Sequence, residues 1–152
     1  MHNEIDEQEQ RRHWMGILAK AAEAELEAMW QAHAPKPEYT FARPPEVGLA
    51  MVQARAGKGG QRFHLGEMTM TRCAVRLRGG ILGCSYVAGR RPRLAELAAV
   101  LDGLLQDAAL RPALMREIID PLEQARKVDR DKLAARTAGT KVDFFTMTRG
   151  ED

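Results

Sequence analysis

Apolar residues in the first third of the chain recur at helical spacing. Between Trp14 and Trp30 an apolar residue stands every three or four positions, separated mainly by Ala, Glu and Gln, which favour helix. Pro35 cannot continue a helix, so the pattern predicts a helix over residues 7–34. Gly16 lowers helix stability by about 1 kcal/mol relative to alanine, so a kink or two shorter helices are open alternatives.

The middle of the chain follows a period of two, which is the period of a strand. From Thr71 to Arg78, small or apolar residues at odd positions alternate with mostly arginine at even positions. Tight turns are possible at residues 57–60 and 79–80, which are rich in glycine. Short strands joined by such turns imply an antiparallel meander, because parallel strands need crossovers for which there is no room. We expect strands over residues 39–41, 49–55, 62–66, 68–78 and 81–87.

The last third returns to helical spacing. Leucines between Leu94 and Leu105 mark an amphipathic helix that would cover the sheet. A break at Pro112 precedes a short helix, and Asp120-Pro121 then begins another helix that runs to about Thr137, with Asp120 as its N-cap.

The predicted fold class is therefore α+β. An N-terminal helix (or two helices) precedes an antiparallel β-meander of about four to five strands. Two or three C-terminal helices pack on the sheet, and an extended C-terminal tail follows. We expect residues 1–152 to form a single domain, with residues 1–6 and 138–152 extended or bound to a partner.

The net charge of +2 conceals a strong asymmetry. Between Arg43 and Arg93 the sequence holds ten basic residues and two acidic ones, a net charge of +8 that leaves −6 for the rest. A positive face of this kind suits phosphate, nucleic acid or an acidic protein. Two groups of arginines are candidate contacts for phosphate or an acidic partner: the stripe with Arg72 and Arg76, and the turn with Arg90 before a helix. A solvated sheet face is the alternative for the stripe.

Residue patterns for chemistry are few. The four histidines show no metal-ligand spacing, Cys73 and Cys84 form no CxxC pair, and no GxSxG or P-loop pattern occurs. We expect two reduced thiols, no metal, no bound cofactor and no catalysis by this chain alone. The polar start and the lack of an apolar run of ~20 residues predict a cytoplasmic protein that does not bind a membrane.

Nucleic-acid binding is weakly supported. RNA-binding sheets usually carry aromatic side chains on which bases stack, and the predicted strands offer only Phe41, Phe63 and Tyr86. A stand-alone module that binds a small anion or nucleic acid stays open as an alternative function.

An ordered set of segments resembles the PhnG family of the bacterial carbon–phosphorus lyase system. These segments are Arg12 to Met15, Glu46 to Leu49, Val52 to Arg55, Gly66 to Leu77, Gly83, Tyr86 to Arg90, Val142 to Met147 and Arg149-Gly150. The resemblance runs in order from about Arg12 to Gly150, and none of its segments is catalytic.

The resemblance implies a subunit that acts with PhnI-, PhnH- and PhnJ-like partners and a PhnK-like subunit of the ATP-binding-cassette type. Such a complex lets a phosphonate displace adenine from ATP, which gives a ribose 1-phosphonate 5-triphosphate; ATP is a substrate of the complex. The PhnI-like subunit would carry that reaction. Apolar side chains at the two ends would then contact partners, and the candidates are Trp14, Met15, Phe144, Phe145 and Met147.

The chain departs from the resemblance at two places. The family's Gly-Arg turn is often followed by an acid and then a His, where this chain has Arg91 and Leu94. Any chemical role for that acid or His is therefore in doubt here. The helix breaker expected near Ala21 to Ala24 is also missing, which predicts a weaker hinge in the N-terminal helix.

Overall fold

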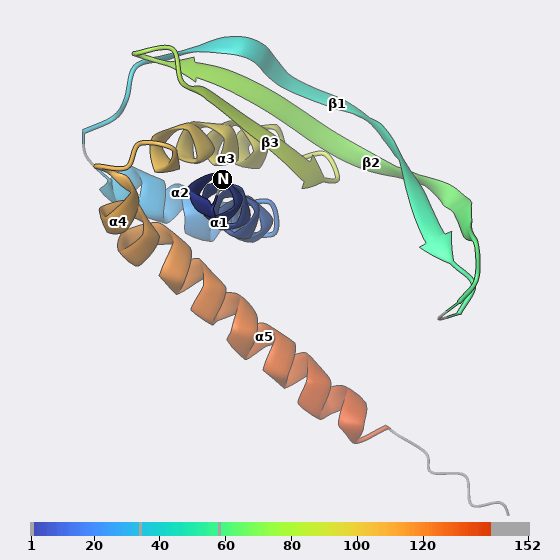
Figure 1. Cartoon of the computed structure of the whole chain (residues 1–152). Coiled ribbons are helices and arrows are strands. Elements are labelled where there is room, and N and C mark those ends of the chain that lie inside the picture. The colour runs from blue at the N-terminus through green and yellow to red at the C-terminus, as the bar shows by residue number, and fades with distance from the viewer. Residues whose placement is uncertain (1, 34, 58, 141–152) are drawn as a thin grey trace, which may run out of the picture.

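The structure is a computed structural model that describes residues 2–33, 35–57 and 59–140. Helices stand at both ends of the chain and three strands lie between them (Figure 1). The elements in order are α1 His2–Leu18, α2 Glu23–Ala32, β1 Tyr39–Arg55, β2 Arg62–Leu77, β3 Leu82–Ala88, α3 Pro92–Leu105, α4 Arg111–Leu114, a π-helix Met115–Ile119 and α5 Asp120–Ala138. The α+β class is confirmed.

The three strands form one antiparallel sheet in the order β1-β2-β3. Helix α3 packs along one face of this sheet (Figure 1). The alternation predicted for β2 is confirmed, because Thr71, Cys73, Val75 and Leu77 are buried toward the helices. The opposite face carries Arg72 and Arg76 and has no helical cover in Figure 1.

The strands are fewer and longer than predicted. Strand β1 continues through Pro44-Pro45, with register shifts on both sides of Arg43. Proline lacks the backbone N–H that a central strand must donate, but an edge strand with bulges tolerates it. The predicted strands 39–41 and 49–55 are thus one strand, and so are 62–66 and 68–78.

The N-terminal helical region is two helices, which confirms the second of the two predicted alternatives, although the break does not lie at Gly16. The chain turns at residues 19–22, which contain no glycine or proline, whereas Gly16 stays inside α1. Ala21 is buried at this turn, and both Leu18 and Leu26 enter the core. Tertiary packing therefore makes the break that local residue preferences did not predict.

The core lies between the sheet and the helices and is centred on α3. Every residue of α3 from Leu94 to Leu105 is buried except Glu96. Strand β3 approaches this helix closely at Gly83, where an added Cβ would lie 2.0 Å from the carbonyl oxygen of Ala99. Only glycine allows this approach, and the small residues of α3 make room for it.

The C-terminal helical run is continuous rather than interrupted at Asp120. Asp120 has helical dihedrals and no capping hydrogen bond, so its predicted role as an N-cap is wrong. Pro121 still disturbs the run, because it donates no hydrogen bond and the wider π-turn Met115–Ile119 lies directly before it.

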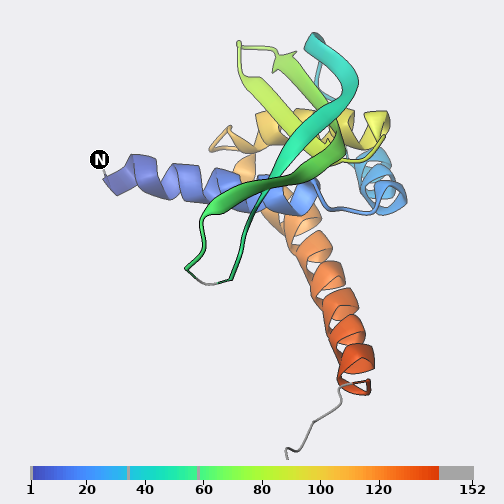
Figure 2. The ribbon, with the colours of Figure 1, turned by 90° about the vertical axis from the view of Figure 1, so that its right-hand side faces the viewer.

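Long elements project from this body. The far part of the β1–β2 hairpin extends past the helices, and α5 points away from the sheet as a single rod (Figures 1 and 2). Within the described residues, no helix is both long and apolar enough to cross a membrane.

Candidate functional site

The predicted arginine stripe lies on the open face of the sheet. Arg72 faces Tyr86 across the β2–β3 ladder, and Arg76 faces Leu82. Arg72 is paired within the chain, since its Nη2 lies 3.1 Å from Glu46 Oε2 and its Nε donates to the same oxygen. These hydrogen bonds lower the pKa of Glu46. Arg76 has no ion pair among the described residues.

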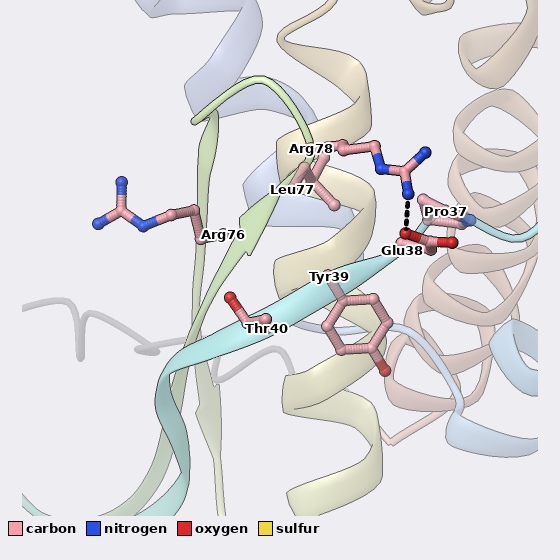
Figure 3. A pocket seen from close by; sticks show the side chains of 7 residues that line it. All are labelled: Pro37, Glu38, Tyr39, Thr40, Arg76, Leu77 and Arg78. Carbon is pink, nitrogen blue, oxygen red and sulfur yellow. Dashed lines mark ion pairs between the residues drawn. The ribbon is translucent and has the colours of Figure 1, made fainter.

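A cavity of about 560 Å³ opens beside Arg76 (Figure 3). Its lining includes Tyr39, Leu77 and the ion pair in which Arg78 Nη2 lies 2.5 Å from Glu38 Oε2. In Figure 3 the Arg76 side chain points away from this pair. The cavity thus offers one guanidinium without an ion pair, that of Arg76, and the hydroxyl of Thr40, which are groups that can bind an anion.

Arg90 lies at the other end of the same ladder. The turn that carries it is held by Thr71, whose hydroxyl donates to the carbonyl of Gly89 and accepts from the N–H of Arg91. Gly89 supplies the left-handed conformation that the turn needs, with φ 84°.

The three predicted arginines do not converge on one site. The ladder ends near Arg90 at the Met70–Ala88 pair and near Arg76 at the Arg76–Leu82 pair. These ends are about 20 Å apart at ~3.3 Å per residue. Leu94, at the place of the expected family histidine, is fully buried and has no polar role.

Folding neutralises part of the basic segment. Arg93 donates to Glu27 and to Glu96, which both lie outside that segment in the sequence, at 2.7 Å and 3.0 Å. Hydrogen bonds from Arg93, and secondly from Gln31, lower the pKa of Glu27 to about 2. Burial and a hydrogen bond to Glu96 raise the pKa of Tyr39 to about 12. This network joins α2, α3 and β1.

A buried carboxylate, Asp102 of α3, joins this helix to α1 and β3. Its two oxygens accept hydrogen bonds from Arg11 at 2.7 and 3.1 Å, from Trp14 Nε1 at 3.0 Å and from the Cys84 N–H at 2.9 Å. Gln106 adds a longer bond at 3.3 Å. Sequence reasoning missed this cluster. The signal for it was a single acid inside an otherwise apolar helical stripe.

The cluster explains where Trp14 lies. The indole is 2% exposed and packs in the core of its own chain, so little of it is available to a partner. Met15 is partly buried against the same core. Phe144, Phe145 and Met147 lie outside the described residues. An interface role for these five residues stays a prediction.

The described residues hold no catalytic constellation. No group of three His, Cys, Asp or Glu side chains among them is placed to hold a metal ion. Burial raises the pKa of Cys73 to about 11 and also raises that of Cys84, so neither thiol is activated. Phe41 shares a sheet face with Val75 whereas Tyr86 shares the other face with Arg72, so the aromatics form no stacking platform.

The most exposed of the large apolar side chains in the described strands were also missed. They are Leu49, which is 68% exposed, and Leu65, which is 65% exposed, and both lie on the projecting part of the hairpin. The sequence shows these residues as ordinary strand positions, and only the length of the hairpin beyond β3 leaves them uncovered.

Comparison with known proteins identifies one family over nearly the whole chain. The model of the family described as "Phosphonate metabolism protein PhnG" matches residues 9–150. A relative from Rhizobium meliloti (strain 1021) is 44% identical over 144 residues, which cover 94% of this chain and 91% of the relative. That relative is named alpha-D-ribose 1-methylphosphonate 5-triphosphate synthase subunit PhnG. The chain belongs to the PhnG family, and the predicted resemblance is confirmed.

Proposed function

We propose that this chain is the PhnG subunit of a ribose 1-methylphosphonate 5-triphosphate synthase and acts in the breakdown of phosphonates. The observation that carries this proposal is the 44% identity to a synthase subunit, spread over 94% of the chain.

The chain contributes to the synthase by assembly rather than by catalysis. Its described residues offer no metal site, no activated thiol and no convergent arginines. ATP and a phosphonate are substrates of the complex, whose other members are PhnI-, PhnH- and PhnJ-like subunits and a PhnK-like subunit in the cytoplasm. The PhnI-like subunit supplies the reacting groups, and this chain binds no cofactor.

Co-expression with a PhnI-like subunit tests this function. The complex should have a defined mass. In the presence of methylphosphonate, adenine should be released from ATP only when both chains are present. Equal activity of the PhnI-like subunit without this chain would contradict the proposal. A monomer that binds ATP or RNA alone, with a Kd that weakens in salt, would favour the stand-alone module instead.

A further inference from the structure

The far part of the β1–β2 hairpin, residues 47–57 and 59–70, is here called the arm. Strand β3 pairs with β2 only as far as Met70, so beyond that residue the arm is a two-stranded ribbon. It extends by about 20 Å from Leu49 to Arg55 at ~3.3 Å per residue. A two-stranded hairpin without a third strand or a covering helix is marginally stable in water.

Both faces of the arm carry exposed apolar side chains, with Glu67 and Thr69 beside those on the face of Leu49 and Met51. Leu49 and Met51 continue the face of Thr71 that lies toward the helices, yet they are 68% and 54% exposed. Met68, paired with Ala50, is exposed on the opposite face. In Figure 1 this part of the ribbon extends beyond every helix of the described residues. Exposed apolar surface on a strand pair is otherwise a hazard for aggregation.

Two glycines in the arm are not required by any turn or close contact among the described residues. Gly48 and Gly66 lie in strand interiors, on the face that also carries Ala50 and Met68. Neither has a positive φ, and a Cβ added at either position would meet nothing within 4 Å. Glycine weakens a strand, and in a strand interior it often marks a close approach of another backbone. No such approach comes from the described part of this chain.

The tip of the arm is cationic. Arg55 and Arg62 are directly opposite each other across the ladder, and both are exposed. Like charges in this position are destabilising. Neither arginine has an ion pair with the described residues, and the sequence adds Lys58 between them. The arm thus ends in a charge that a carboxylate-bearing surface would complement.

From these observations we propose that the arm docks in a groove of another subunit of the synthase. The occupant is a protein whose groove is apolar, whose backbone lies against Gly48 and Gly66, and whose carboxylates bind Arg55 and Arg62. This inference rests on the proposed function, because it needs a partner subunit. The two glycines and the charged tip favour a protein groove as the occupant. Burial of the apolar side chains of the arm would by itself require neither glycine nor arginine at these positions.

Three variants of the full chain separate the parts of this proposal. G48V/G66V should raise the Tm of the isolated chain, because valine favours strands and has free space here, yet weaken assembly at least tenfold. R55E/R62E should also weaken assembly at least tenfold. The matched control K20E/R130E makes the same charge change at exposed positions outside the arm and should assemble normally.

The test measures assembly with the co-expressed synthase subunits and hydrogen exchange of the arm amides. In the wild type, the amides of residues 47–55 and 62–70 should exchange quickly in the isolated chain and at least tenfold more slowly in the complex. Normal assembly of both arm variants, or an unprotected arm in the complex, would overturn the proposal.

Other occupants give distinct results. Arm protection that rises with the concentration of the isolated chain would show a second copy and overturn the proposal. Normal assembly of R55E/R62E with a raised KM for ATP would place the tip at the triphosphate instead. If the wild-type chain assembles with no synthase subunit, the proposed function itself fails. If the wild-type chain assembles with the synthase subunits and both arm variants assemble equally well, the docking proposal fails but the proposed function stands.

Discussion

Replacing Asp102 by asparagine should destabilise the fold strongly although the shape is kept. Every group that faces the carboxylate is a donor: Arg11 and Trp14 reach Oδ1, while Arg11 and the Cys84 N–H reach Oδ2. Asparagine has one acceptor oxygen and one NH₂ group. Whichever way it is turned, its NH₂ group meets donors and leaves them unpaired.

The magnitude follows from burial. Asp102 is fully buried, and breaking a buried ion pair by removing one partner costs about 3–5 kcal/mol. The Arg11 side chain is 37% exposed and can turn partly to water, which reduces that cost. We therefore expect D102N to lower the free energy of unfolding by about 3 kcal/mol, or the Tm by roughly 6–12 °C for a chain of this size.

Urea unfolding followed by far-ultraviolet circular dichroism measures this loss. The control is E117Q, which removes an exposed pair with a 3.7 Å separation from Arg116 and should change stability by about 0.5 kcal/mol or less. The double variant R11A/D102N should be less destabilised than the sum of its single changes, because the two groups interact directly. A loss below about 1 kcal/mol for D102N would refute the reasoning.

Three further outcomes are expected. G83A places a Cβ against the backbone of α3 and should cost about 2–3 kcal/mol or prevent folding, which soluble yield and urea unfolding would reveal. The folded pKa of Glu27, about 2, lies below its ordinary 4.5, so the stabilisation by Arg93 is complete above pH 4.5 and is lost as the pH falls toward 2. The Tm difference between wild type and E27Q should therefore shrink between pH 6 and pH 3, and a constant difference would count against the pair. At pH 8, iodoacetamide should modify half-buried Cys84 slowly and buried Cys73 only after the chain unfolds. Mass spectrometry measures the rate of modification at each cysteine. Rapid modification of Cys73 in the folded chain would disprove its burial.

Local periodicity determined most of the elements. The leucine spacing of α3 and the alternation from Thr71 to Leu77 depend only on 3.6-residue and two-residue repeats, and both predictions are confirmed. The family resemblance was likewise visible in the ordered segments, since these are properties of the sequence itself.

Long-range contacts decided the rest. A break at residues 19–22 and a strand that runs through Pro44-Pro45 both contradict local preference, because packing on α3 and an edge position outweigh it. Asp102 meets Arg11 across 91 positions, a distance at which no spacing rule operates.

For the charge and the apolar surface too, the sequence determined which residues are present and the tertiary structure determined which of them are paired or covered. The sequence alone determined that residues 43–93 are strongly basic and placed Glu96 three positions after Arg93 on one helix, but only folding brought Glu27 to Arg93 and left Arg55 and Arg62 without such partners. The sequence likewise determined which strand residues are apolar. Whether a helix covers them depends on how far the hairpin extends past α3, and that is set by the packing of the whole chain.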